Sequence, residues 1–378
     1  MSDGLTSSSW ELEAHTAAKL QILGAYLRAW FPILSRVRNF DRIIYIDGFA
    51  GPGRYKGGED GSPVIALKAA LGALNGEIDK AYEFHFVELG PAVAAALAAN
   101  IEHFKQHHVV PPSIEIFIHD RMTFEETYQQ RIRARLQVHP SAPAFALIDP
   151  FGWTGIPMSI LGELVRRPST EILVNFMFEE INRFLFHPDQ VANFDTLFAC
   201  ADWRRGSEMR SLKRKQFIHD LYRDRLRQAA GARYVRSFEM RNERNVCDYF
   251  LYFASNNRLG LKKMKEAMWK VDPAGGFTFS DATNLDQAVL FQPEPDRREL
   301  RRLISGRFAG RRATVNQVDS FVIEDTPFHG GHYRKVLAAM EKDGELTPVN
   351  PPPNRRKGTY SNSSLLLEFS IKGTPWPS

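Results

Sequence analysis

Cysteine is scarce in this chain, and its scarcity excludes several classes of protein. The 378 residues contain two cysteines, Cys200 and Cys247. Neither has a partner at the spacing of a zinc site, and two thiols do not build a disulfide-rich scaffold. We therefore expect no metal and a reducing compartment, the cytoplasm.

Long hydrophobic runs are also missing. No stretch approaches the ~18 consecutive apolar residues that mark a membrane-spanning helix. Residues 1–10 lack the basic and then apolar pattern of an export signal. These absences predict a protein with no membrane partner.

Charge of one sign is only slightly in excess, because the formal net charge is +5. The location of the basic residues is therefore more informative than their total. They gather in two segments, residues 204–227 and 297–312. The chain is 43% hydrophobic and longer than the ~250–300 residues at which one core stops growing, so we expect a large domain and a smaller one.

Short apolar runs alternate with helical patterns over the first two thirds of the chain, which is typical of a parallel sheet flanked by helices. An amphipathic helix at 11–34, ending near Pro32, comes first. Strands are predicted at 43–47, 84–88, 114–118, 144–149 and 172–177, with helices at 63–74, 91–105, 124–138 and 157–166. A helix at 213–229 and a hairpin of strands 234–240 and 248–254 follow. This predicts an α/β, Rossmann-like class I methyltransferase sheet of seven strands, mostly parallel, with a terminal antiparallel hairpin.

The domain boundaries follow from composition. We predict that residues 1–35 form a helix packed on the core and that residues 36–271 form the Rossmann-like domain. Residues 272–296 are rich in glycine, proline and turn formers and are predicted to be the linker. Residues 297–378 show helical patterns at 298–304, 315–321 and 332–342, a basic proline-rich turn at 350–357 and a strand at 365–371. Three helices followed by a wing predict a winged-helix-like domain.

A glycine-rich turn directly follows the first predicted strand, in the segment Asp47-Gly48-Phe49-Ala50-Gly51-Pro52-Gly53. Glycine permits a tight turn and a close approach of the backbone to a ligand, and ligands bind at this edge of open α/β sheets. The predicted cofactor contacts are Asp47, Phe49, Ala50, Gly51 and Gly53. The alternative is an ordinary turn.

Two further acids end the next strands. Glu88 could accept hydrogen bonds from ribose hydroxyls, and Asp120 could accept one from the amine of an adenine ring. Each alone could be a strand-end residue without a ligand. A dinucleotide fingerprint needs Gly-x-Gly-x-x-Gly opening a helix, but Phe49 replaces the first glycine and the helix begins near Ser62. The pattern therefore favours S-adenosylmethionine over NAD.

The fourth strand ends in Asp149-Pro150-Phe151-Gly152-Trp153. Asp149 and the Pro150 carbonyl could accept hydrogen bonds from a target amine, while Phe151 or Trp153 stacks on its base. The alternative is a turn with both aromatic side chains in the core. Other residues considered for the cleft are His15, Lys19, Asn175 and Asp281, but a solvated helix face explains the first two equally well.

The residues Asp47 to Tyr55 resemble the cofactor loop of ribosomal-RNA methyltransferases that modify base amines. The chain is more similar to the three-Cys-motif partner protein family, TcmP. That resemblance spans nearly the whole chain and rests on His15-Thr16, Lys19, Tyr26 to Leu34, Gly58 to Pro63 and Met264 to Asp272. It implies a methyltransferase-like domain with a winged-helix tail and a partner, a radical S-adenosylmethionine protein bearing three cysteines. Phe151 and Gly152 depart from the Asp-Pro-Pro-Tyr/Phe signature of amino-methyltransferases.

Arginines interleaved with apolar residues predict a basic amphipathic helix at the start of the last domain, and a basic turn lies in the wing. The predicted nucleic-acid contacts are Arg297, Arg298, Arg301, Arg302, Arg307, Arg311, Arg312, Arg355, Arg356 and Lys357. A solvated charged face, or a protein-binding winged helix, is the alternative. Two functions follow: methyl transfer to an amine nitrogen of DNA or RNA, or a non-catalytic adaptor that presents nucleic acid to the three-cysteine radical protein.

Overall fold

The computed structural model describes residues 11–74, 80–273, 278–280 and 295–370. The chain divides into two compact units. The first comprises Met1–Ala267 and Thr278–Asp286, and the second Met268–Phe277 and Gln287–Ser378. Asp281 and most of the predicted linker lie outside the described residues, so the predicted boundaries stay predictions.

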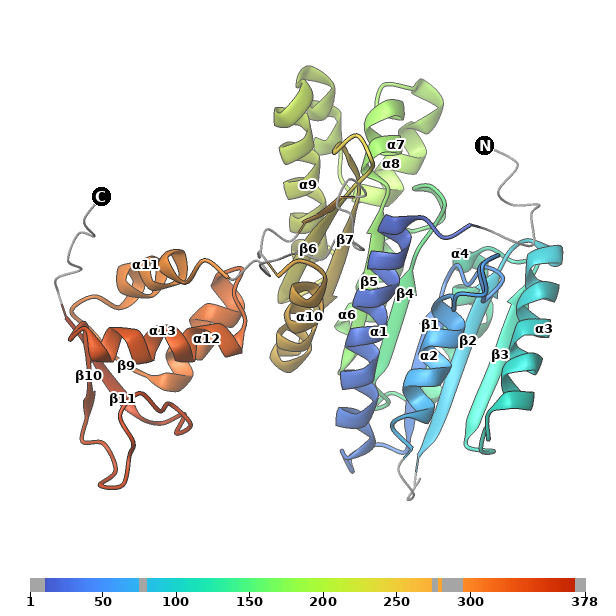
Figure 1. The fold of residues 1–378 in the computed structure, drawn as a ribbon. Coiled ribbons are helices and arrows are strands. Elements are labelled where there is room, and N and C mark those ends of the chain that lie inside the picture. The colour runs from blue at the N-terminus through green and yellow to red at the C-terminus, as the bar shows by residue number, and fades with distance from the viewer. Residues whose placement is uncertain (1–10, 75–79, 274–277, 281–294, 371–378) are drawn as a thin grey trace. The chain divides into compact units, whose positions relative to one another are not determined.

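The first unit is built on one sheet (Figure 1). Its strands are β1 (Arg42–Asp47), β2 (Ala81–Glu88), β3 (Ile114–Asp120), β4 (Ala144–Ile148), β5 (Thr170–Phe176), β6 (Tyr234–Arg241), β7 (Cys247–Ser255) and β8 (Thr278–Ser280). Their order is β3-β2-β1-β4-β5-β7-β6-β8, and β7 runs antiparallel to both of its neighbours. The predicted mostly parallel sheet with a terminal hairpin is confirmed.

The sheet has eight described strands, where the sequence predicted seven. The additional strand, β8, has three residues and pairs in parallel with β6 at the edge of the sheet. Three residues are too few to show an alternating hydrophobic pattern, which explains why the sequence did not reveal it.

Helices cover both faces of this sheet. They are α1 (Ala14–Ser35), α2 (Ser62–Leu71), α3 (Pro91–His107), α4 (Phe124–Thr127), α5 (Arg133–Val138), α6 (Met158–Arg166), α7 (Phe178–Phe184), α8 (Val191–Phe198), α9 (Ser211–Gln228) and α10 (Arg258–Val271). Helices α1 and α2 lie side by side on one face (Figure 1). There Tyr26 and Phe31 of α1 contact Phe145 and Phe84 of the sheet.

Two predicted helices differ from the structure. Helix α1 continues through Pro32 to Ser35, since a proline so near the end removes one N–H donor without preventing a last turn. The predicted helix at 124–138 is interrupted by a π-helical segment, Tyr128–Ile132, between α4 and α5. Hydrophobic spacing alone does not register such a one-turn change of pitch.

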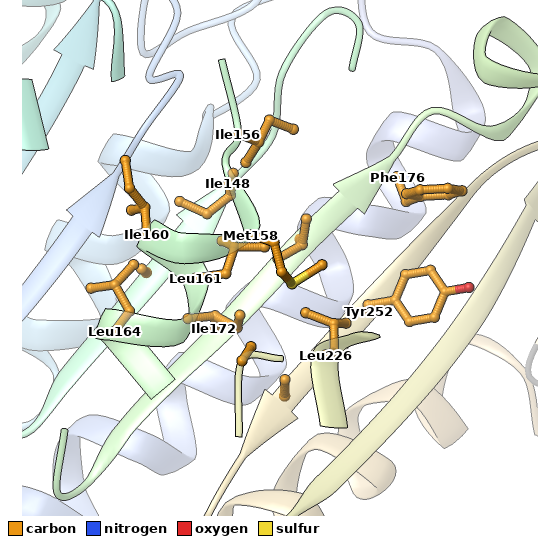
Figure 2. Close-up of a cluster of buried hydrophobic side chains, with 14 of the residues drawn as sticks. Ile148, Ile156, Met158, Ile160, Leu161, Leu164, Ile172, Phe176, Leu226 and Tyr252 are labelled. Atoms are coloured by element: carbon orange, nitrogen blue, oxygen red, sulfur yellow. The ribbon is translucent and has the colours of Figure 1, made fainter. Parts of the chain in front are cut away.

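The main hydrophobic core lies on the opposite face of the sheet, where strands β4 and β5 meet α6 and α9 (Figure 2). Ile148 and Ile172 of the strands contribute to it, with Leu161 and Leu164 of α6 and Leu226 of α9. All are fully buried. This core holds β4 and β5 rigidly, and therefore fixes the residues that follow them.

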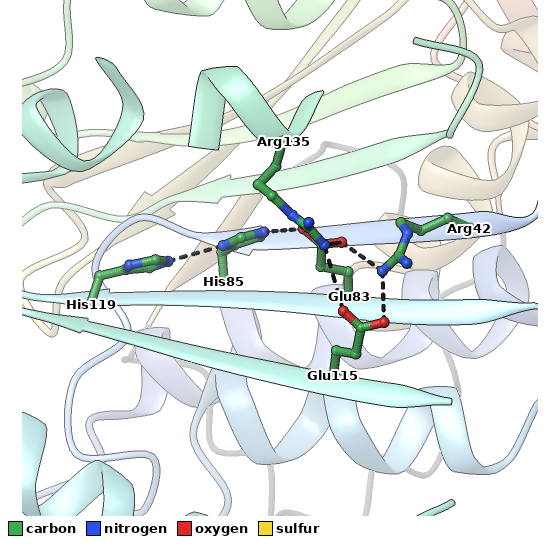
Figure 3. Close-up of polar contacts among 6 residues, drawn as sticks. All are labelled: Arg42, Glu83, His85, Glu115, His119 and Arg135. Carbon is green, nitrogen blue, oxygen red and sulfur yellow. Dashed lines mark hydrogen bonds and ion pairs between the residues drawn. The ribbon is translucent and has the colours of Figure 1, made fainter. Parts of the chain in front are cut away.

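A buried network of charges joins β2 to its neighbours (Figure 3). Glu83 accepts hydrogen bonds from Arg135 at 2.7 and 3.0 Å and from Arg42 at 2.7 Å. On its other side, His85 Nε2 lies 2.6 Å from Glu83, and His85 Nδ1 lies 2.9 Å from His119. Burial opposes ionisation, but the bonds from His85 and Arg135 outweigh it and lower the pKa of Glu83. The network fixes α5 on the sheet.

The second unit contains α11 (Arg297–Phe308), β9 (Arg312–Thr314), α12 (Val315–Asp325), α13 (Gly330–Lys342), β10 (Leu346–Val349) and β11 (Leu366–Phe369). Its strands form a sheet in the order β10-β11-β9. Leu300 and Ile304 of α11, Val318 of α12 and Leu337 of α13 form its own core with Leu367 of β11. The three predicted helices and the final strand are confirmed, and β9 and β10 complete a winged helix.

Candidate cofactor and substrate cleft

The candidate site lies where the strand order reverses, between β1 and β4. In open α/β sheets, ligands bind beyond the carboxyl ends of the strands at such a point. A cavity of about 330 Å³ lies here, and its lining includes Ala50 and Gly53 after β1, Asp149 and Pro150 after β4, and Lys19 of α1. The residues predicted at two strand ends are thus brought together.

The glycine loop after β1 is held by Glu88. Gly51 and Gly53 have φ angles of 62° and 80°, in the left-handed region that favours glycine. The N–H of Gly51 donates to Glu88 Oε2 at 3.1 Å, and the N–H of Gly90 donates to Glu88 Oε1 at 2.8 Å. Each carboxylate oxygen still has a lone pair for another donor. Burial raises the pKa of Glu88, so a bound hydroxyl would meet a largely desolvated acceptor.

Asp47 ends β1 beneath the loop and is fully buried. Its Oδ1 accepts from the N–H of Phe49 at 3.3 Å, while its Oδ2 is buried with no hydrogen-bond partner among the described residues. Burial raises the pKa of Asp47 to about 7 and the nearby Asp149 carboxylate adds to the rise, while the Ser62 hydroxyl and the Phe49 N–H act against it. A buried acceptor with an unsatisfied oxygen costs free energy unless a donor reaches it.

Asp149 is held on both sides. Lys19 Nζ lies 2.5 Å from Asp149 Oδ2, and Asn175 Nδ2 donates to Asp149 Oδ1 at 2.7 Å. The lysine comes from α1 and the asparagine from β5. Lys19 also lies over the ring of Tyr249, 5.6 Å from its centroid. The sequence left Lys19 equally explained as a solvated residue, but the structure buries it in the cleft, whose wall also includes His15.

A second cavity, of about 570 Å³, lies on the other side of Phe49 and Phe151, which line both cavities together with Pro150. Glu88 also lines this larger cavity. Residues that the sequence analysis missed complete its wall: Leu89, Met122, Thr123, Phe124 and Glu180. Met122, Thr123 and Phe124 follow β3, so their place after a strand end was the available signal.

The two aromatic residues after β4 have different surroundings. Phe151 is 56% exposed and lines both cavities. Trp153 is 9% exposed and packs in the core against Phe184 and Phe194, with ring centroids 5.1 and 5.8 Å away. Trp153 is therefore a core residue, and of the two only Phe151 faces the cleft.

Asp120 lies outside the lining of both cavities. Its carboxylate is 3.4 Å from Arg121 and is largely exposed. It stands opposite Glu88 in the strand register, so its backbone is at the correct edge of the sheet. Its predicted contact with an adenine amine stays a prediction.

Comparison with known proteins supports the winged helix. A family model described as a GMT-like wHTH domain matches residues 278–353. No curated protein sequence matches the chain. The TcmP resemblance therefore stays a prediction, while the tail is a winged helix.

Two solved structures are similar over part of the chain. One is protein LPL1258 from Legionella pneumophila str. Philadelphia 1, of family DUF519, with a TM-score of 0.36 and 11% identity over 62% of this chain and 84% of that chain. The other is the METTL16 MTase domain, with a TM-score of 0.28 and 11% identity over 61% of this chain and 66% of that chain. At these scores neither supports an inference about function, so the fold class rests on the strand order.

Four of the nine arginines predicted to bind nucleic acid are paired with acids of their own unit: Arg301, Arg302, Arg312 and Arg355. Arg355 forms a bidentate pair with Glu341 at 2.8 and 2.7 Å, and Tyr360 also donates to that carboxylate. Arg301 bonds to Glu345 at 2.9 Å and to Asp343. Both arginine side chains are mostly buried. They stabilise the wing and α11 and are not available to phosphates.

The remaining basic residues divide into three groups. Arg302 and Arg312 are exposed but paired with Glu299 and Glu368. No ion pair among the described residues involves the side chains of Arg307, Arg311, Arg356 or Lys357, and all four residues are exposed. Arg297 and Arg298 both make contacts. Two exposed basic residues of α13, Arg334 and Lys335, were missed because they do not lie in a dense basic run.

Across the part of the chain that the structure describes, no helix is long and apolar enough to cross a membrane. Within the same residues, no group of three or more His, Cys, Asp or Glu side chains could hold a metal ion.

Proposed function

We propose that this protein binds S-adenosylmethionine in the cleft and transfers its methyl group to an amine nitrogen of nucleic acid. The observation that carries the proposal is that the Gly51–Gly53 turn, which Glu88 holds and Asp47 underlies, borders the cavity lined by Asp149 and Pro150. Acceptors for an adenosyl group thus lie next to acceptors suited to an amine.

The residues fit this cofactor. The two cavities are within the ~300–1,000 Å³ of small-molecule sites and have wall residues in common. The unsatisfied Asp47 oxygen offers a buried acceptor for the ammonium of the methionyl part, and Glu88 offers one for the ribose. Gly53 has a φ of 80°, and a Cβ there would lie 2.9 Å from Leu97 Cδ1, so a side chain at this position would strain the loop and displace Leu97.

The chain's own groups would orient the reaction. When bound, the cofactor supplies an electrophilic methyl group. Phe151, exposed on the cleft wall, would stack on the target base, and the Pro150 carbonyl would accept a hydrogen from the amine. Asp120 would lie at the adenine edge.

Nucleic acid as the substrate is supported by the winged helix. The second helix of its helix–turn–helix, α13, presents Arg334 and Lys335 to solvent. In this class of fold that helix enters the major groove, while basic residues of the wing contact phosphates. Of the predicted basic contacts, Arg307, Arg311, Arg356 and Lys357 are the ones we retain.

The test is a binding and transfer assay. Calorimetry of the purified chain with S-adenosylmethionine should show micromolar binding, and radiolabelled donor should transfer methyl groups to a DNA or RNA pool. Binding without transfer to any pool would refute the catalytic part, and no binding would refute the cofactor assignment. The radical-protein partner implied by the resemblance stays a prediction that co-purification can test.

A further inference from the structure

The cleft contains a second buried polar atom without a partner, and it belongs to a residue that the proposed reaction has not used. Asn175 ends β5, lines the smaller cavity and is 4% exposed. Its Nδ2 donates to Asp149 at 2.7 Å and contacts Met177 Sδ at 3.3 Å. Its Oδ1 is buried and has no hydrogen-bond partner among the described residues.

The orientation of this amide follows from chemistry. Asp149 is ion-paired with Lys19, and an ionised carboxylate only accepts hydrogen bonds. Asn175 must therefore turn its NH₂ group to Asp149, because the flipped amide would place two acceptors face to face. Lys19 thus fixes Asp149, and Asp149 fixes Asn175, so that Oδ1 is left as the acceptor.

The same contacts limit what Asp149 itself can do. One of its oxygens is taken by Lys19 and the other by Asn175. An amine that approached Asp149 would have to share an oxygen with one of these donors. Asn175 Oδ1 has no donor to share, and leaving it unpaired carries the cost of a desolvated acceptor.

We infer that Asn175 Oδ1, with the Pro150 carbonyl, receives the hydrogens of the substrate's exocyclic amine, and that Asp149 and Lys19 are positioning residues. This deepens the proposed function, on which it rests. The site selects a base bearing an amine over one bearing a carbonyl or hydrogen at that position. It also gives α1, outside the sheet, a part in substrate choice.

The experiment measures binding to the full chain saturated with S-adenosylhomocysteine. The probes are adenosine, cytidine and guanosine, each compared with the same nucleoside lacking its exocyclic amine, by ligand-detected NMR. At least one amine-bearing nucleoside should bind about tenfold more tightly than its counterpart. Asn175→Leu should abolish this preference and leave cofactor affinity unchanged.

Controls separate the role of the acceptor from a loss of structure. Asn193→Leu makes the same substitution on α8, outside the lining of both cavities, and should keep the preference. Asn175→Asp is a second test, for use if the leucine variant does not fold. It places a carboxylate beside Asp149 and should weaken the preference for the amine. Lys19→Met, which removes the charge, should reduce the preference, and Lys19→Arg, which keeps the charge, should retain most of it. If Lys19 only stabilised the fold, the preference for the amine would not follow its charge in this way.

A preference that persists in both Asn175 variants would overturn the inference, as would a wild-type protein that shows no preference. Methyl transfer is scored separately. A preference that depends on Asn175, without any transfer to nucleic acid, would refute the proposed reaction and leave the acceptor assignment standing.

Discussion

The cleft of the sheet unit and the wing of the winged-helix unit treat buried polar groups differently. In the sheet unit, the cleft leaves Asp47 Oδ2 and Asn175 Oδ1 buried without partners. In the winged-helix unit, the buried guanidinium groups of Arg301 and Arg355 are fully engaged by acids. An unsatisfied acceptor in a cleft is a candidate partner for a ligand, whereas the satisfied pairs of the wing already have their hydrogen bonds within the fold. A count of charged residues does not separate these cases.

The largest effect we expect is on stability in the winged helix. Arg355→Ala leaves the buried Glu341 carboxylate without its guanidinium partner, and breaking such a pair costs about 3 kcal/mol or more. Hydrogen exchange in peptides from residues 330–369 should accelerate accordingly. Arg356→Ala, at the exposed neighbouring position, is the matched control and should change exchange little. Equal hydrogen-exchange rates in the two variants would show that the buried Arg355–Glu341 pair does not stabilise the wing.

The next effect is on cofactor affinity. Glu88→Ala removes the acceptor for the N–H groups of Gly51 and Gly90 and for the proposed ribose. We expect about 100-fold weaker S-adenosylmethionine binding by calorimetry, which is about 3 kcal/mol. Glu102→Ala, on the exposed face of α3, should bind as the wild type does. An unchanged affinity in Glu88→Ala would remove Glu88 from the site.

A smaller effect concerns pH. The pKa of Asp47 is about 7 in the fold, above the ordinary value of 3.8, so the folded state holds a proton that the unfolded state has released between these values. Stability therefore falls as pH rises through this window, by about 1 kcal/mol between pH 5 and 6. Asp47→Asn should remove this part of the decline in denaturant titrations. Burial raises the pKa of Glu171 to about 7 as well, so Glu171→Gln is the parallel case. A decline equally steep in Asp47→Asn would contradict the assignment.

The smallest effect is on nucleic-acid binding. Arg356→Ala and Lys357→Ala should each weaken DNA or RNA binding by less than about 1 kcal/mol and lower the salt dependence by about one unit of slope. The loss should not depend on sequence. Fluorescence anisotropy across a salt series measures it. Arg312→Ala, whose guanidinium is already paired with Glu368, should show the smaller change.

The sequence predicted the positions of the acids that lie at strand ends. Asp47, Glu88 and Asp149 follow buried parallel strands, and the ends of such strands meet at one edge. Partners from distant segments were not predictable in this way. Lys19 and Asp149 are 130 positions apart, and Arg355 lies 14 positions from Glu341 across a wing. Each residue alone resembled an ordinary charged residue.

Other elements escaped prediction because their signals were weak. Helices α7 and α8 have seven and eight residues, about two turns each, in a segment of mixed polar and apolar residues between β5 and α9. For Trp153 the sequence suggested a role that the structure does not give it. Its position after Asp149 and Pro150 indicated the cleft, but its side chain lies in the core. The turn at Gly155, with a φ of 75°, directs the chain back toward the core before α6 begins.

Helix α1 contacts two acids of the sheet unit, one in the core and one in the cleft. Its Tyr26 donates a hydrogen bond to the buried Glu171 of β5, and its Lys19 pairs with Asp149 at the carboxyl edge of the sheet. A recombinant fragment trimmed to the sheet and its crossover helices would consequently lose a wall of the cleft and expose two acids to water. Expression plasmids for this protein should retain the leading helix, and a bulky fusion placed directly before it would be a poor choice.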